Sequence, residues 1–294
     1  MQAKTLLLAT DLSPASVAAL PHAARLAWAT GAEVVVATVA TRVEVEADGG
    51  AGLRRLEAFR EALTQMDVRA RSILLDGARA HAEDVLLRYA REESVDAIVV
   101  TRHGERAEAG HIGSSTVALA RTSPVPVLVA HGPASHSPSE AVRPAEWKRL
   151  LAATDFSEAA SITVHRAADL ARQLQGELEL LTVLVDARCP LDVGPNHVHF
   201  AKMPSDLATW ARDSGTRLDA LAGAIGGVAN ARVVAAEDAA AGIVGAALQD
   251  NVDLLVVAAG SRGPIEYLFL GSTTEAVLRL SPLPVLVLRG RLAD

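Results

Sequence analysis

Three glycines and a run of hydroxyl side chains follow an apolar stretch near the C-terminus. The apolar run at 254–257 ends shortly before a loop that contains Gly260, Gly263 and Gly271. A helical pattern begins at Ser272. Glycine lets a backbone adopt positive φ and approach a ligand closely. The first N–H groups of a helix have no partner within the helix, so they can bind an anion. This spacing predicts a phosphate site at the carboxyl end of a parallel strand.

The segments around this stretch occur twice in the chain and in the same order. LLLATDLS at 6–13 returns as LLAATDFS at 150–157, and SPVPVLVA at 123–130 returns as SPLPVLVL at 281–288. Between them, VDAIVV is matched by VDLLVV, and GSSTVALAR by GSTTEAVLR. Several matches in one order indicate an internal repeat rather than chance.

A length of 294 residues suits two domains of ordinary size. We therefore predict one domain at 1–130 and a second at 148–294. The segment 131–147 is rich in Pro and Ser and is interpreted as the linker between them.

Apolar runs and helical patterns alternate within each copy. The first copy is expected to form strands at Thr5–Ala9, Glu33–Ala40, Val68–Leu75, Ala97–Val100 and Val125–Ala130. The second is expected to form them at Arg149–Ala153, Glu177–Val185, Ala231–Ala236, Leu254–Ala258 and Val285–Leu288. Alternation at this spacing predicts βαβ units and an α/β fold with a parallel sheet.

Composition limits the class of protein. The net charge is −7 and the pI is about 5.7, which argues against nucleic acid as the main partner. One cysteine, Cys189, excludes an internal disulfide and favours a reducing compartment. The apolar runs have strand length and no stretch reaches a membrane span. We expect a cytoplasmic protein that does not enter a membrane.

The repeated pieces together resemble the universal stress protein family, with a tandem pair of domains covering nearly all of the chain. They are a strand ending in ATD(F/L)S, a VDxxVV strand, a glycine loop ending in Gly-Ser, and a closing PVLV strand. The resemblance implies a five-stranded parallel sheet with helices on both faces in each copy, a Rossmann-like domain of the adenine nucleotide alpha hydrolase kind. It also implies a role in stress responses, and some members bind ATP while others do not.

Matched residue by residue, the second copy carries the family's nucleotide-binding positions. These are Asp155, Val183, Gly260, Gly263, Gly271, Ser272 and Thr273. Arg262 lies inside the first glycine turn and is predicted to contact phosphate. The copy departs from the family in its loop, because 264–270 has seven residues where the family pattern has nine. The implied ligand is ATP or a related adenine nucleotide, with or without Mg²⁺.

The first copy matches the same positions less completely, at Asp11, Val39, Gly104, Gly113 and Ser114. Counting back from Gly104, Thr101 is interpreted as standing in place of the first glycine. A Cβ there would resist positive φ, and Glu105 and Glu108 bring negative charge near any phosphate. We therefore predict that nucleotide binds mainly in the second copy.

Each of these features also has a simpler interpretation. The glycines and Gly-Ser could form only a tight turn and a helix start, and Asp11 and Asp155 could cap the turns that follow them. The pair His197 and His199 lacks the spacing of a closed zinc site, so no metal is predicted. No motif for a catalytic nucleophile, a Walker loop or a metalloprotease is present, so no catalytic residue is predicted.

Two functions of different classes follow. In the first, nucleotide binding in the second copy switches the conformation of the chain and its contact with an unknown protein partner. In the second, the chain is a nucleotide-free interaction platform, or the irregular segment 186–203 covers a different small ligand. The resemblance further suggests that the two copies pair as a pseudo-dimer, and we expect that two chains can form a homodimer.

Overall fold

The structure is a computed structural model of the whole chain. It describes residues 3–41, 43, 47–77, 80–102, 112–133, 135, 137–141, 143–186, 205–260 and 270–289. The chain forms two compact units, the first built mainly from Met1–Glu146 and the second from Trp147–Arg291. Each unit is described by itself.

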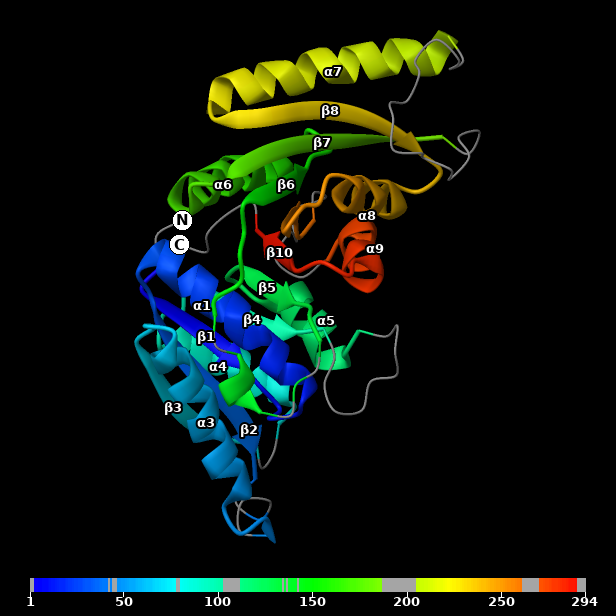
Figure 1. Cartoon of the computed structure of the whole chain (residues 1–294). Helices are drawn as coiled ribbons and strands as arrows, with labels where there is room; N and C mark the ends of the chain where they lie inside the picture. Colours follow the sequence, from blue (N-terminus) through cyan, green and yellow to red (C-terminus); the bar gives the residue numbers. More distant parts are fainter. Residues whose placement is uncertain are drawn as a thin grey trace. The chain divides into compact units, whose positions relative to one another are not determined.

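The first unit is a parallel sheet with helices on both faces (Figure 1). Its strands are β1 (Thr5–Ala9), β2 (Glu33–Ala40), β3 (Ala70–Asp76), β4 (Ala97–Thr101) and β5 (Val127–Ala130), in the order β3-β2-β1-β4-β5. Its helices are α1 (Ala19–Thr30), which follows the short 3-10 helix η1 (Ala15–Ala18), α3 (Ala51–Gln65), α4 (Ala82–Glu92) and α5 (Ser114–Thr122). The central strands are apolar throughout because both of their faces are covered.

The second unit repeats this arrangement. Its strands are β6 (Arg149–Ala153), β7 (Glu177–Val185), β8 (Val228–Ala236), β9 (Leu254–Ala258) and β10 (Val285–Leu288), in the order β8-β7-β6-β9-β10. Its helices are α6 (Glu158–Leu174), α7 (Ser205–Ile225), α8 (Ala239–Gln249) and α9 (Ser272–Leu280). Figure 1 shows α7 lying along β8, and α8 beside α9.

The predicted fold class, two tandem α/β domains with parallel five-stranded sheets, is confirmed. Five strand boundaries differ from prediction by one to three residues: both ends of β3, the end of β4, and the starts of β5 and β8. The strand β3 begins at Ala70 because the N–H of Val68 donates to Leu63, at 3.1 Å, in the turn that ends α3. The strand β8 begins at Val228, three residues before the predicted start, because a bulge opposite Leu178 keeps its first residues paired with β7.

The recurring Val-Asp pair has a structural cause. One carboxylate oxygen of Asp96 accepts the N–H groups of Lys4 and Thr5, at 2.6 and 2.9 Å. Asp253 makes the same two bonds to the start of β6, at 2.7 and 2.8 Å. In each copy the residue before one strand therefore fixes the start of its neighbour.

The segment predicted to be a linker makes contacts within the first unit. The N–H of Ser135 donates to Pro14 at 3.0 Å, and that of Ala145 donates to Pro21 at 2.8 Å. The short 3-10 helix η2 (Pro138–Glu140) packs on α3. The role of 131–147 as a linker stays a prediction.

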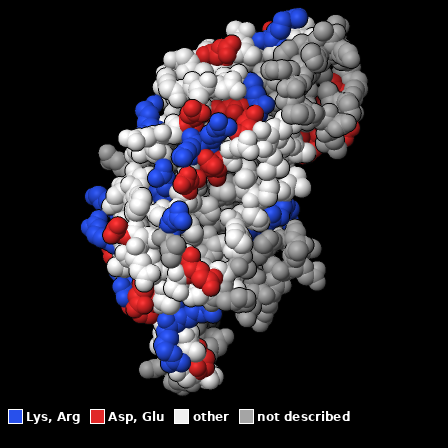
Figure 2. All heavy atoms as spheres, viewed as in Figure 1, with Lys and Arg blue, Asp and Glu red and all other residues white. Residues whose placement is uncertain are grey.

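On the face drawn in Figure 2, basic and acidic side chains are interspersed among the described residues. Among the helices that the structure describes, none is both long enough and apolar enough to cross a membrane.

Candidate functional site

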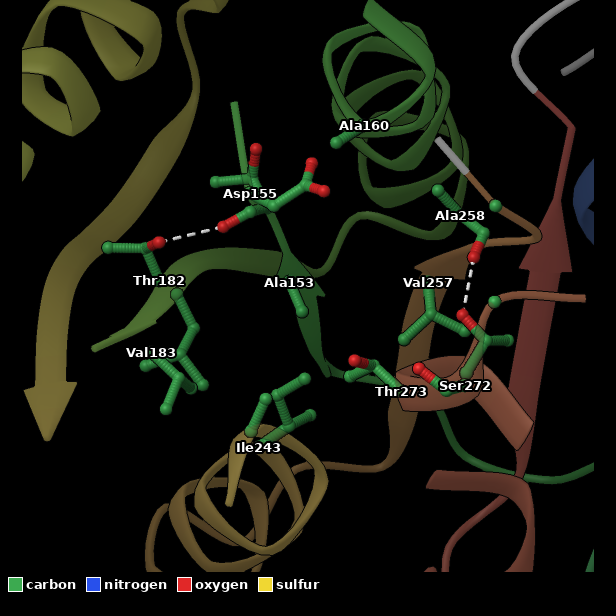
Figure 3. Close-up of a pocket in the computed structure, with 16 residues that line it drawn as sticks. Ala153, Asp155, Ala160, Thr182, Val183, Ile243, Val257, Ala258, Ser272 and Thr273 are labelled. Carbon is green, nitrogen blue, oxygen red and sulfur yellow. Dashed lines mark hydrogen bonds between the residues drawn. The ribbon is translucent and has the colours of Figure 1, made fainter. Parts of the chain in front are cut away.

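A pocket of about 380 Å³ opens at the carboxyl edge of the second sheet (Figure 3). It is lined by the residues after β6, the last part of β7, the end of β9, and the first turns of α8 and α9. Because β6 lies between β7 and β9, the chain connections leave β6 in opposite directions here. Ligands of open α/β sheets bind at such a switch point.

The pocket brings together six of the eight residues predicted for the second copy. They are Asp155, Val183, Gly260, Gly271, Ser272 and Thr273. The other two, Arg262 and Gly263, lie outside the described residues. Residues distant in the sequence thus line one cavity, and their contact with a nucleotide stays a prediction.

The turn after β6 is held by threonine hydroxyls. Thr182 on β7 donates its hydroxyl to the carbonyl oxygen of Thr154 at 2.8 Å, and the N–H of Thr154 donates to Leu181 at 2.8 Å. The Thr154 hydroxyl oxygen accepts the N–H of Phe156 at 3.0 Å, and Phe156 adopts a left-handed φ of 62°. These bonds fix the backbone on both sides of Asp155 at the wall of the pocket.

Asp155 also caps the turn that follows it, which was the simpler interpretation. Its Oδ1 atom accepts the N–H of Ser157 at 3.0 Å, and the Ser157 hydroxyl oxygen accepts the N–H of Ala160 at 3.2 Å. Capping does not move the residue away from the cavity, since Asp155 and Ala160 both line it. The capping bonds are therefore compatible with ligand contact by Asp155, which stays a prediction.

The start of α9 is fixed from outside the helix. The N–H of Gly271 donates to the carbonyl oxygen of Ala259 at 2.6 Å, and the Thr274 hydroxyl donates to Ala258 at 2.6 Å. Both bonds tie the first turn of α9 to the chain at the end of β9. The residues Ser272 and Thr273 are thereby placed at the wall of the pocket.

Among the helices that line the pocket, α9 differs in its N-terminus. The helices α6 and α8 are capped by their own side chains, Ser157 to Ala160 and Asp238 to Ala241, the latter at 2.9 Å. In the part of the chain that is described, α9 begins at Gly271 with no side-chain cap. Its first N–H groups are therefore the ones that can receive an anion from the pocket.

Gly271 does not use the conformational freedom of glycine. Its φ is −62° and its ψ 145°, an extended conformation that any residue adopts, and Gly113 in the first copy is alike at −60° and 140°. Neither position therefore uses the positive φ that glycine allows. A Cβ on Gly271 would lie 3.6 Å from Gly260 and from the carbonyl oxygen of Ala259, an ordinary van der Waals contact, so this position accepts a side chain.

The opposite side of the pocket is apolar. Val183 from β7 and Ile243 from α8 lie together, while Ser272 and Thr273 lie across the cavity from them (Figure 3). Sequence reasoning missed Ile243 and Thr182. Thr182 had a signal, because it precedes the matched Val183 in a strand, but only the packing of α8 over β7 brings Ile243 to the cavity.

The comparisons with known proteins agree with this architecture. A family profile described as the universal stress protein family matches residues 2–131 and 146–289. The chain belongs to the universal stress protein family. A search of curated proteins found no match.

Solved universal stress proteins share the fold over nearly the whole chain. One from Archaeoglobus fulgidus DSM 4304 is 20% identical, covers 99% of this chain and 100% of its own, and has a TM-score of 0.67. One from Pseudomonas aeruginosa UCBPP-PA14, described as putative, is 15% identical, covers 97% and 93%, and has a TM-score of 0.67. A shorter universal stress protein, solved in complex with cAMP, is 24% identical and covers 45% of this chain and 99% of its own, with a TM-score of 0.38.

In the first universal stress protein domain, the described matched residues lie at the carboxyl edge of the sheet, as their counterparts do in the second domain. Asp11 follows β1 and its Oδ1 atom accepts the N–H of Ser13 at 3.0 Å, as Asp155 does in the second domain. Val39 lies in β2, and Gly113 and Ser114 form the start of α5. Gly104 lies outside the described residues.

The alignment of Thr101 with the first glycine is wrong. The Thr116 hydroxyl donates to the carbonyl oxygen of Thr101 at 2.9 Å, and this is the bond that Thr274 makes to Ala258. Thr101 therefore corresponds to Ala258, two residues before Gly260. The residue at the Gly260 position of the first domain is His103 in the sequence, so the first domain still lacks this glycine.

Proposed function

We propose that this universal stress protein binds ATP or a related adenine nucleotide in the pocket of its second domain, with or without Mg²⁺, and that binding acts as a regulatory switch in a stress response. The observation that carries the proposal is the pairing of an uncapped helix start with an apolar wall in one cavity of about 380 Å³. That volume lies within the range of small-molecule sites, about 300–1,000 Å³.

The phosphates are assigned to the start of α9. The backbone N–H groups and the hydroxyls of Ser272 and Thr273 can donate to phosphate oxygens, and the positive end of the helix dipole favours their charge. Gly271 leaves this end open. In the sequence, Arg262 and Gly263 follow Gly260 and are proposed as further phosphate contacts.

The base is assigned to the apolar wall, where Val183 and Ile243 offer methyl groups to an aromatic ring. Asp155 is proposed to accept a hydrogen bond from a ribose hydroxyl, the role of a carboxylate in other dinucleotide-binding sheets. Since β7 and β9 flank β6, the two ends of the pocket are about 10 Å apart, two strand spacings. An adenosine with phosphates extends over that distance.

The proposed switch is the chain between Gly260 and Gly271. The proposed nucleotide contacts the two ends of this segment, at β9 and at the start of α9. Binding there is proposed to shift the population of conformations that differ in the surface contacted by a partner. A homodimer and an unknown protein partner stay predictions.

The alternative is a nucleotide-free interaction platform. It is favoured by the loop 264–270, which is two residues shorter than the family pattern, and by the missing glycine of the first domain. A different ligand under 186–203 also stays a prediction, and residues 187–203 lie outside those described.

Calorimetric titration with Mg-ATP tests the proposal, after denatured protein has been checked for released nucleotide. The variant is Gly271→Val, whose backbone conformation accepts valine and whose Cβ would lie beside Gly260 and Thr274, two residues that line the pocket. The matched control is Gly113→Val, at the same place in the first domain. We expect about one equivalent in the wild type and the control, and none in Gly271→Val.

Titration with cAMP runs beside ATP, because a shorter relative was solved with that ligand. Absence of binding and of released nucleotide in the wild type would contradict the proposal and favour the platform. Equal binding in Gly271→Val and the wild type would show that the nucleotide lies elsewhere.

A further inference from the structure

The helices α5 and α9 both start without a side-chain cap, but the first domain holds a carboxylate beside the start of α5. The hydroxyl of Ser115, in the first turn of α5, donates to Oε2 of Glu83 at 2.9 Å. Glu83 lies in the first turn of α4, and α4 packs beside α5. An acidic side chain of the protein itself is thus bound beside the N-terminus of α5.

The second domain has no carboxylate at the equivalent place of α8, and Glu275 in the first turn of α9 accepts a bond from Arg279 at 2.8 Å. The helices α4 and α8 begin at Ala82 and Ala239, so Glu83 corresponds to Ala240. Ser115 likewise corresponds to Thr273, because α5 and α9 both begin one residue after a glycine. Thr273 lines the nucleotide pocket, whereas its counterpart Ser115 is bonded to a carboxylate.

A negative charge at this point has two consequences. It interacts favourably with the positive end of the α5 dipole, as an external anion would. It also opposes the entry of a phosphate, because like charges brought together at a partly dehydrated site repel each other strongly. One glutamate can therefore both stabilise the helix start and change which ligands the site accepts.

We propose that Glu83 is an internal anion that excludes nucleotide phosphates from the first domain. The chain then takes one nucleotide rather than two, and the choice of domain is determined at one position of α4 and α8. This inference rests on the proposed function for its ligand. Glu83 thus sets which domain binds the nucleotide, without contacting the nucleotide of the second domain.

The test is the stoichiometry of Mg-ATP binding to the full chain in the variants Glu83→Gln and Glu83→Ala. Both remove the charge, and glutamine keeps a hydrogen-bond acceptor for Ser115. The matched control is Asp84→Asn, because Asp84 is exposed in the same turn of α4. We expect the affinity of the first domain to rise by about tenfold or more, so that a second, weaker equivalent appears in both Glu83 variants and not in the control.

The outcomes separate this inference from the proposed function. One equivalent in every protein would overturn the inference and leave the proposed function standing. Two equivalents in the wild type would also overturn it, since the first domain would then bind with Glu83 in place. No binding in the wild type would contradict the proposed function, and one equivalent gained in the Glu83 variants alone would still support the internal anion.

The reciprocal variant Ala240→Glu places the carboxylate in the second domain. We expect it to weaken Mg-ATP binding there by about tenfold or more. Ala240 is buried, so circular dichroism must show that this variant folds, and Ala241→Asp is its control for an added charge. A folded Ala240→Glu protein that binds as the wild type does would overturn the inference.

Discussion

Arg166 donates from Nη1 to the carbonyl oxygen of Arg289 at 2.9 Å, and this bond ties the first helix of the second domain to the end of its last strand. In the first domain, Nε2 of His22 lies 3.1 Å from the carbonyl oxygen of His131, at the equivalent place. The contact is shared, but its donor is arginine in one domain and histidine in the other. Only the histidine can lose its charge near neutral pH.

The histidine makes the stability of the first domain sensitive to acid. Burial lowers the pKa of His22 below its usual 6.5, and burial and the neighbouring Arg102 lower that of His131. Below pH 6.5 the unfolded chain takes up protons that the folded chain does not. The free energy of unfolding therefore falls as pH decreases from 6.5 towards the folded pKa, by about 1.4 kcal/mol per pH unit for each histidine.

Chemical denaturation of the full chain between pH 7.5 and 5 measures this slope. The variant His22→Gln keeps an N–H donor for His131 and cannot titrate. We expect the slope to be shallower by about one proton in this variant. An unchanged slope would mean that His22 binds its proton equally well in the folded and unfolded chains.

Substituting two glycines of α8 allows the apolar wall of the pocket to be tested with a matched control. A Cβ on Gly242 would lie 2.9 Å from Cγ1 of Val183 and 3.0 Å from the Cβ of Ala236, whereas nothing lies within 4 Å of a Cβ on Gly245. We expect Gly245→Ala to stabilise the domain by about 0.5–1 kcal/mol through helix propensity. Gly242→Ala should destabilise it by about 1–3 kcal/mol through overpacking.

The two variants should also differ in ligand binding. Displacing Val183 moves the apolar wall, so Gly242→Ala should bind Mg-ATP several-fold more weakly while Gly245→Ala binds as the wild type does. Thermal unfolding and calorimetry measure the two effects. Equal affinity in a folded Gly242→Ala protein would show that Val183 does not contact the ligand.

The sequence predicts the fold well because the repeat and the buried strands leave little choice. Leu6, Leu7 and Leu8 are fully buried in β1, and an uninterrupted apolar strand of this kind requires helices on both faces of a parallel sheet. The turns after β1 and β6 are also predictable from the sequence, because each is held by a bond between an aspartate and the serine two residues later. Boundaries such as the start of β8 depend on a bulge against another strand, which no local pattern reveals.

The candidate site was only partly predictable. Asp155, Val183 and Ser272 follow from matched positions, and they meet in one pocket. Ile243 does not, because its place depends on how α8 packs over β7. The sequence alone aligns Thr101 with the first glycine of the loop, because the glycine spacing is its only guide there. The hydrogen bond from Thr116 to Thr101 shows instead that Thr101 corresponds to Ala258.

Hydrogen–deuterium exchange with and without saturating Mg-ATP tests the central claim most directly. Phosphates bound to the start of α9 occupy the N–H groups of Ser272 and Thr273, so these amides should exchange more slowly with ligand. The equivalent amides of α5, Ser114 and Ser115, provide an internal reference and should not change. Protection at α5 instead of α9, or no protection at either helix, would contradict a nucleotide site in the second domain.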